Sequence, residues 1–147
     1  MIKSLTTLLA VLMASATLSV SAEQSKSFGD YTVHFSAFTT DILTPEVAKS
    51  YHIPRSKNRA LLNISVLKKV MNTLGSPVRA KIKATATNLS SQLRELNVRE
   101  LTEHGAIYYI AETTVNNEET LKYTLTITPE DEAETYTFSF HQQFFTE

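Results

Sequence analysis

The sequence predicts an all-β protein, an immunoglobulin-like antiparallel β-sandwich of about seven strands with one short helix. Two observations favour this fold class. All 13 Phe and Tyr residues follow residue 22, and threonine is abundant, which is a composition typical of strands. Several segments also alternate apolar with polar residues and are separated by turn signals, as in sandwich domains. An open β-barrel is the alternative architecture.

The first predicted strand covers 30–39. Its apolar residues alternate with polar ones, which is the period of a half-buried strand: Tyr31, Val33, Phe35 and Ala37 oppose Thr32, His34 and Ser36. Thr44, Pro45 and Glu46 then supply an N-cap hydroxyl, a proline suited to the first helical position and a first-turn acid. These residues predict one or two helical turns over 45–51.

The remaining strands follow from alternation and turn residues. The segment 58–70 is apolar on both faces and predicts a central strand, while His104 and Gly105 predict a hairpin turn. Asn116 and Asn117 indicate a second hairpin. The predicted strands are 30–39, 58–70, 78–87, 93–102, 106–115, 120–128 and 135–145, with a loop at 72–77 and an acidic loop at 130–134.

Residues 1–22 have the pattern of a secretory signal peptide. Lys3 provides a positive start, 8–14 is an unbroken apolar run, and small residues precede a cleavage site after Ala22. Threonines and serines interrupt the apolar stretch, so a cleaved leader is favoured over a membrane anchor. The chain has no cysteine, hence no disulfide and no lipid attachment site of that kind. We therefore expect a periplasmic protein.

The mature chain, 23–147, is predicted to be a single domain, since 125 residues can bury one substantial core. Lys3 is the only charged side chain in the leader, so the mature chain has 13 Lys and Arg against 15 Asp and Glu and a net charge of −2. That balance does not indicate nucleic-acid binding.

The histidines are the first candidates for chemistry. His34 and His141 lie on the outward parity of the first and last predicted strands, which are often neighbours in sandwiches. A metal or small-ligand site shared by these two histidines is therefore conceivable, but two ligands are too few to specify a metal. Solvated surface histidines are the simpler interpretation, and no cofactor is predicted.

No catalytic motif is visible in the sequence. There is no nucleophile elbow and no phosphate-binding glycine loop, and the three glycines, Gly29, Gly75 and Gly105, have plausible turn roles. The acidic residues fall mostly in predicted loops, where they favour solubility over acid–base work. We therefore expect a protein that is not an enzyme; a hydrolase or isomerase with an unrecognised site is a further alternative.

A basic loop and two aromatic pairs are candidates for binding. Arg55, Lys57 and Arg59 lie within five residues at the entry to the most apolar strand, and they either bind an anionic partner or hold carbonyls and carboxylates at the sandwich edge. In the pairs 108–109 and 144–145 one ring must face away from the core. That outward ring covers a second buried surface, which we favour, or forms an exposed patch for a partner.

Four segments of the chain resemble a family of small exported proteobacterial proteins known only as a domain of unknown function. These segments are 29–35, 55–66, 106–112 and 140–144 (Phe140-x-Gln142-x-Phe144), and the resemblance spans essentially all of the mature chain. It implies a secreted β domain and no particular activity. In that last segment Gln142 occupies an apolar parity position, which indicates a bulge, a hydrogen-bonded amide or a strand end.

The sequence therefore predicts a non-catalytic interaction module of the cell envelope. It would bind another periplasmic or envelope protein through a sheet edge or the 55–59 loop. The alternative is a carrier of a small ligand or metal ion that uses the surface histidines.

Overall fold

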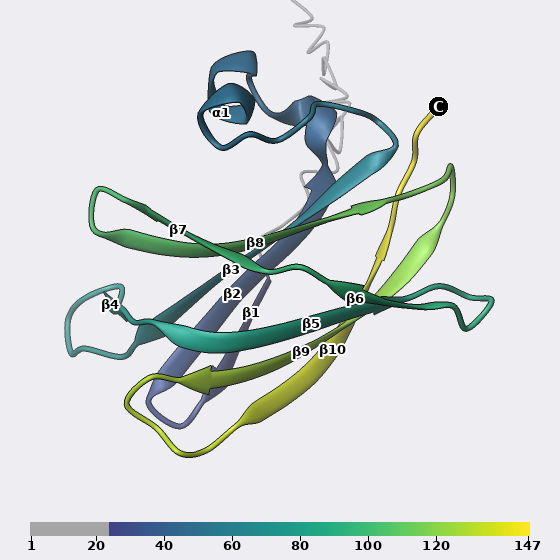
Figure 1. Ribbon diagram of the computed structural model, residues 1–147. Coiled ribbons are helices and arrows are strands. Elements are labelled where there is room, and N and C mark those ends of the chain that lie inside the picture. Colours follow the sequence, from purple (N-terminus) through teal and green to yellow (C-terminus); the bar gives the residue numbers. More distant parts are fainter. Residues whose placement is uncertain (1–23) are drawn as a thin grey trace, which may run out of the picture.

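The computed structural model describes residues 24–147, which form two antiparallel β-sheets packed face to face (Figure 1). The sheets do not close into a barrel, so the predicted β-sandwich is confirmed and the open barrel is not formed. The predicted leader, 1–22, lies outside the described residues.

Ten strands build the two sheets, because two short strands and one split strand add to the seven that were predicted. Sheet A has the order β1-β2-β3-β8-β7, with β4 paired to β3, and sheet B has the order β10-β9-β5-β6. Sheet A comprises β1 (Gln24–Phe28), β2 (Tyr31–Thr39), β3 (Arg59–Lys68), β4 (Ser76–Pro77), β7 (Arg99–Glu103) and β8 (Ala106–Thr114). Sheet B comprises β5 (Ala80–Thr87), β6 (Leu93–Leu96), β9 (Thr120–Pro129) and β10 (Tyr136–Gln143).

One predicted strand is in fact two. The segment 93–102 is interrupted at residues 97–98, so β6 pairs with β5 in sheet B whereas β7 pairs with β8 in sheet A. Leu96 and Val98, on either side of the break, both pack against the main core. The chain thus crosses from one sheet to the other at the edge of the sandwich, which explains why its alternation is poor.

The predicted hairpin at Asn116 and Asn117 is likewise wrong in one respect. A turn does form there, since the Glu119 N–H donates to the Asn116 carbonyl at 3.2 Å and Glu118 has φ +60°. The turn joins β8 of sheet A to β9 of sheet B, so it connects the sheets rather than two paired strands. By contrast, His104 and Gly105 form the predicted hairpin between β7 and β8, both with positive φ.

The predicted helix is confirmed as α1 (Pro45–Ser50), whose N-cap Thr44 hydroxyl accepts a hydrogen bond from the Val47 N–H at 3.3 Å. A 3-10 turn, η1 (Thr40–Ile42), precedes it. The buried Thr40 hydroxyl donates to the Pro54 carbonyl at 2.7 Å and accepts from the Ser56 N–H at 2.9 Å. Residues 40–58 therefore form a compact unit, the α1 cap, which returns to sheet A. No helix in the described part of the chain is long and apolar enough to span a membrane.

The core lies between the sheets and is rich in aromatic rings. The Phe35 ring of β2 has its centroid 4.9 Å from that of Phe138 and 4.5 Å from that of Phe140, both on β10. Tyr123 of β9 stacks on Phe140 at 5.1 Å. The predicted alternation of β2 is confirmed, because Tyr31, Val33, Phe35 and Ala37 are all buried. Interlocked rings from both sheets thus fix the register of β2.

Two core tyrosines differ in how their hydroxyl groups are satisfied. The Tyr109 hydroxyl accepts from the Ala80 N–H at 2.8 Å and donates to Glu100 Oε2 at 3.3 Å, so it ties sheet A to sheet B. The Tyr123 hydroxyl is buried and has no hydrogen-bond partner among the described residues. Burial raises the pKa of Tyr123 well above its usual range.

Because the Tyr109 hydroxyl is hydrogen-bonded and the Tyr123 hydroxyl is not, within the part of the chain that the structure describes, replacing each tyrosine with phenylalanine should have opposite effects on stability. Tyr123→Phe removes a buried, unsatisfied hydroxyl, so we expect the free energy of unfolding to stay equal or rise by up to about 2 kcal/mol. Tyr109→Phe leaves the Ala80 N–H without its acceptor, so we expect a loss of about 1 kcal/mol. Urea unfolding at neutral pH measures both values.

A pH series provides the control. Because burial raises the pKa of Tyr123 in the folded state, its contribution to the free energy of unfolding is constant below the unfolded pKa of about 10, and stability falls as the pH rises further, since the unfolded chain ionises first. Wild type should therefore lose more stability above pH 10 than Tyr123→Phe does. A Tyr123→Phe protein that is clearly less stable at neutral pH would contradict this assignment of the hydroxyl.

Candidate functional site

The outward face of sheet A is half covered. The α1 cap places Ile53 against Leu61 of β3 and Ile110 of β8, and these three form a second small core. Phe38, Leu43, Tyr51 and Leu101 pack around it. The cap ends there, so the rest of the outward face, which carries His34, Ser65 and Tyr108, is left open beside it.

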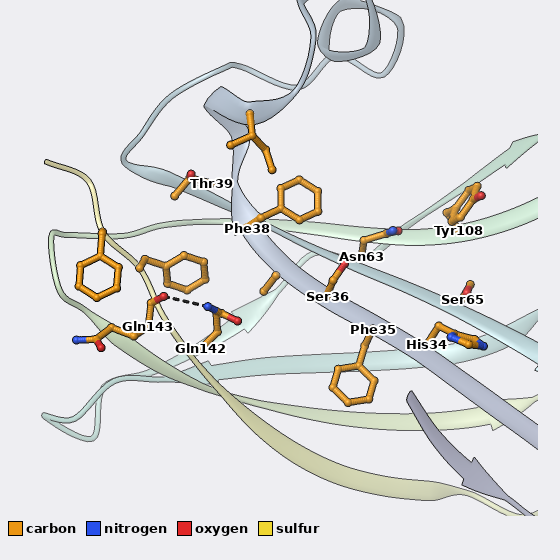
Figure 2. A pocket seen from close by; sticks show the side chains of 14 residues that line it. His34, Phe35, Ser36, Phe38, Thr39, Asn63, Ser65, Tyr108, Gln142 and Gln143 are labelled. Atoms are coloured by element: carbon orange, nitrogen blue, oxygen red, sulfur yellow. Dashed lines mark hydrogen bonds between the residues drawn. The ribbon is translucent and has the colours of Figure 1, made fainter. Parts of the chain in front are cut away.

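A hollow of about 640 Å³ lies along the open part of β2 and reaches the C-terminal segment. Figure 2 shows His34, Ser36 and Phe38 following one another along β2, with Asn63 and Ser65 of β3 next to them, while Phe35 points to the opposite side. Ser36 is the cross-strand partner of Asn63, and His34 is the partner of Ser65. Phe35 nevertheless contributes to the lining of the hollow, and the remaining lining residues are Ala37, Thr39, Ile42, Tyr108, Gln142, Gln143, Phe144 and Phe145.

A second hollow of about 290 Å³ adjoins the first and shares His34, Ser65 and Tyr108 with it. It forms where β3 and β8 part, because their pairing ends at Ile64 and Tyr109, and the short β4 pairs with β3 beyond that point. Its remaining lining residues are Leu67, Leu74, Pro77, Ala106 and Ile107. We call the two adjoining hollows the His34 groove.

The groove is uncharged in a protein with 20% charged residues: no Asp, Glu, Lys or Arg is among the described residues that line it. Charged side chains gather beside the α1 cap instead. Glu112 lies 3.6 Å from Arg59 and 4.0 Å from Arg99, and Arg99 also donates to the Tyr51 carbonyl. The groove therefore offers aromatic rings, hydroxyls, amides and one imidazole to a ligand.

Both ends of the groove are held in place by backbone contacts. At one end the Phe144 N–H donates to the Glu119 carbonyl at 2.9 Å, and the Thr146 N–H donates to Asn117 Oδ1 at 2.9 Å. At the other end Gly75 has φ +105°, and a Cβ there would lie 3.0 Å from both Leu67 Cβ and the Lys68 carbonyl oxygen. Only glycine fits this turn without a shift of its neighbours. The walls are thus pre-arranged rather than loose.

The two histidines singled out in the sequence are not brought together. His34 lies on β2 at the centre of the groove, whereas His141 is exposed on β10, on the outward face of the other sheet. First and last predicted strands are not neighbours here, since β2 and β10 belong to different sheets. No group of three or more His, Cys, Asp or Glu side chains in residues 24–147 is placed to hold a metal ion.

The basic loop has mainly structural contacts. Arg55 Nε donates to the Leu43 carbonyl at 2.7 Å and Nη2 to the Asp41 carbonyl at 3.0 Å, so Arg55 closes the α1 cap. Arg59 faces Glu112. Lys57 is exposed. Arg55 and Arg59 therefore hold carbonyl and carboxylate groups of the fold, as one of the two interpretations of this loop predicted. Binding of a partner by the loop stays a prediction.

Most groove residues were missed because they carry no motif. In the sequence, Ser36 lies on the polar side of the first predicted strand, Asn63 and Ser65 lie in a strand predicted to be apolar on both faces, and Leu74 lies in a predicted loop. The feature of the sequence that pointed to this surface was the two pairs of adjacent aromatic residues, 108–109 and 144–145. Tyr108 and Phe145 are 37% and 62% exposed and both line the groove, so each outward ring is exposed and the favoured burial was wrong. Gln142 lies near the end of β10 and donates to the Gln143 carbonyl at 3.0 Å, as a hydrogen-bonded amide at a strand end.

Comparison with known proteins shows to which protein family this chain belongs. A family model described as "Domain of unknown function (DUF4426)" matches residues 25–147, so the chain belongs to this family, and the resemblance found in the sequence is confirmed. The solved structure of a DUF4426 family protein from Pseudomonas aeruginosa PAO1 is 33% identical and has a TM-score of 0.74. The match covers 85% of this chain and 96% of that chain.

More distant solved structures share the fold. FetP of uropathogenic Escherichia coli strain F11, expressed recombinantly in the periplasm, is 11% identical with a TM-score of 0.61, over 86% of this chain and 95% of that one. A copper-bound variant of FetP is similar at 11% identity and a TM-score of 0.60, over 86% and 97%. Such low identity shows a common fold alone. Among curated protein sequences, none matches this chain significantly.

The Arg55 contacts predict a stability difference within the basic loop. Arg55→Ala removes two hydrogen bonds that close the α1 cap, so we expect a loss of up to about 1 kcal/mol in the free energy of unfolding, limited by solvent exposure. Lys57→Ala, two residues away, is the matched control and should change it by less than about 0.5 kcal/mol. Equal effects in urea unfolding would show that Arg55 does not hold the cap.

Proposed function

We propose that this DUF4426 protein is an exported, non-catalytic interaction module that binds another envelope protein in the His34 groove. The leader pattern of residues 1–22 supports export and function in the periplasm. The observation that carries the proposal is the uncharged, aromatic-lined groove on the half of sheet A that the α1 cap leaves open.

The composition of the groove favours a protein partner. The centres of protein interfaces are poor in charged residues and rich in aromatic ones. Tyr108 and Phe145 provide exposed rings, and Ile42 and Leu74 add exposed aliphatic side chains. An apolar surface of this kind, rimmed by polar residues, is typical of an interaction site.

The same lining favours binding over catalysis. Acid–base catalysis uses titratable groups positioned against one another, commonly with a carboxylate that orients a histidine. Among the described lining residues, the titratable side chains are His34 and Tyr108. Ser36 and Ser65 supply hydroxyls, but no Asp or Glu is among the described residues that line the groove. We therefore propose that the protein is not an enzyme.

Crosslinking inside the cells that make the protein tests this proposal. A photoreactive phenylalanine in place of Tyr108 should crosslink to one defined partner, because its ring faces the groove. The same residue in place of Lys83, which is exposed on β5 of sheet B, should not. A Lys57 position tests the basic loop; a crosslink there and none at Tyr108 would contradict the groove proposal in favour of the loop.

A matched pair of serines shows whether the crosslink depends on the groove. Ser65→Asp adds a charge to the groove floor and should abolish the Tyr108 crosslink, since an unpaired charge resists burial. Ser139→Asp is the control, because Ser139 is also half-buried but lies on β10 of sheet B. Loss of the crosslink with both variants, or with neither, would count against a specific interface.

A metal-ion carrier is the second candidate function. The observation that favours it is the copper-bound FetP variant, which has the same fold, together with the central place of His34. If the groove bound copper or zinc through His34, His34→Ala would abolish binding in calorimetric titrations of the purified protein and His141→Ala would not. We expect no stoichiometric binding by any of the three proteins; a stoichiometric site lost only with His34→Ala would establish the carrier function.

A further inference from the structure

We propose that the His34 groove selects an extended, uncharged peptide segment that carries two apolar side chains on one face, six residues apart. This inference rests on the proposed function and specifies what the partner presents. It is carried by the distribution of side chains in the groove, which has exposed apolar side chains near both ends and polar side chains between them.

The first apolar anchor is the second hollow. Leu67, Pro77 and Ile107 line it, and Leu74, which is 96% exposed, forms its outer rim. The Thr73 N–H and hydroxyl both donate to the Val70 carbonyl, at 3.1 and 2.9 Å, and the Gly75 N–H donates to the Thr73 hydroxyl at 3.1 Å. Leu74 is thus presented by a closed turn. A space of this size suits one large apolar side chain.

The second apolar anchor lies at the other end of the larger hollow. Phe38 of β2, Ile42 of the α1 cap and Phe145 of the C-terminal segment provide its apolar surface, beside the polar side chains of Thr39, Gln142 and Gln143. Ile42 and Phe145 are 65% and 62% exposed, so a partner side chain placed between them would cover apolar surface that solvent now reaches. The backbone on either side of Phe145 is already held by hydrogen bonds from Phe144 to Glu119 and from Thr146 to Asn117. Binding therefore does not have to order this segment, which lowers its entropic cost.

Polar side chains separate the two anchors. His34 and Ser65 form one cross-strand pair and Ser36 and Asn63 form the next. Hydroxyl and amide groups both donate and accept hydrogen bonds, so they match the N–H and C=O groups of an extended peptide backbone. They offer no counter-charge, and a charged side chain buried here would lack a partner. The middle of the segment is therefore expected to be uncharged.

The register of sheet A sets the spacing. Leu67, at the first anchor, is the cross-strand partner of Thr32, and the second anchor lies at Phe38 on the same strand. Six residues of strand span about 20 Å, at 3.3 Å per residue. An extended segment directs every second side chain to one face, so two apolar side chains six residues apart reach both anchors.

Selection from a displayed library of random 12-residue peptides tests the inference, with protein produced from the full chain as bait. We expect enriched peptides to lack charge in the middle and to carry apolar residues six positions apart. Leu74→Ser should weaken binding of a selected peptide about tenfold, and Phe145→Ser likewise. Leu89→Ser and Leu93→Ser are matched controls, 84% and 64% exposed on the β5–β6 hairpin, and should change the affinity less than twofold.

The outcomes separate the inference from the function on which it rests. Enriched peptides that lack the apolar pair, but whose binding is lost with Ser65→Asp, would overturn the two-anchor inference and leave the groove as the interaction site. Peptides whose binding responds to Leu89→Ser and Leu93→Ser instead would overturn both. A library that yields no binder would also contradict both, since a groove for extended segments must retain some of them.

Discussion

The fold depends on the seating of Phe35 between the two sheets. Its ring packs against Phe138 and Phe140 of β10, and because side chains alternate along a strand, this contact fixes the face on which every other β2 residue lies. His34 and Ser36 must then point outward from sheet A. A shift of one residue would bury these polar groups and expose the core, so the packing of the sandwich and the position of the His34 groove follow from the same interaction.

Local patterns in the sequence predict the elements well where one face is buried. Alternation located β2, β5 and β9, and the Thr44 and Pro45 signals located α1. Alternation does not specify which strands pair, because any strand with one apolar face can occupy either sheet. For that reason the division of 93–102 between sheets was missed, and His34 and His141 were considered together although they lie on different sheets.

The groove was beyond prediction for a related reason. It arises because the α1 cap covers one half of sheet A, and because β3 and β8 part beyond Ile64 and Tyr109. Both are tertiary features that leave no periodic trace. The sequence did show that one ring of the pairs 108–109 and 144–145 must face away from the core. Whether such a ring is covered depends on where residues 40–58 fold back, which local sequence does not encode.

The most direct test of the groove as a binding surface needs no knowledge of the partner. Hydroxyl-radical footprinting compares side-chain labelling of the protein inside the cells that make it with labelling of the purified protein. An occupied groove predicts that Leu74, Tyr108 and Phe145 are protected in cells, whereas Leu89 and Leu93, exposed on a distant hairpin, are labelled equally in both states. Equal labelling of all five side chains would contradict the account.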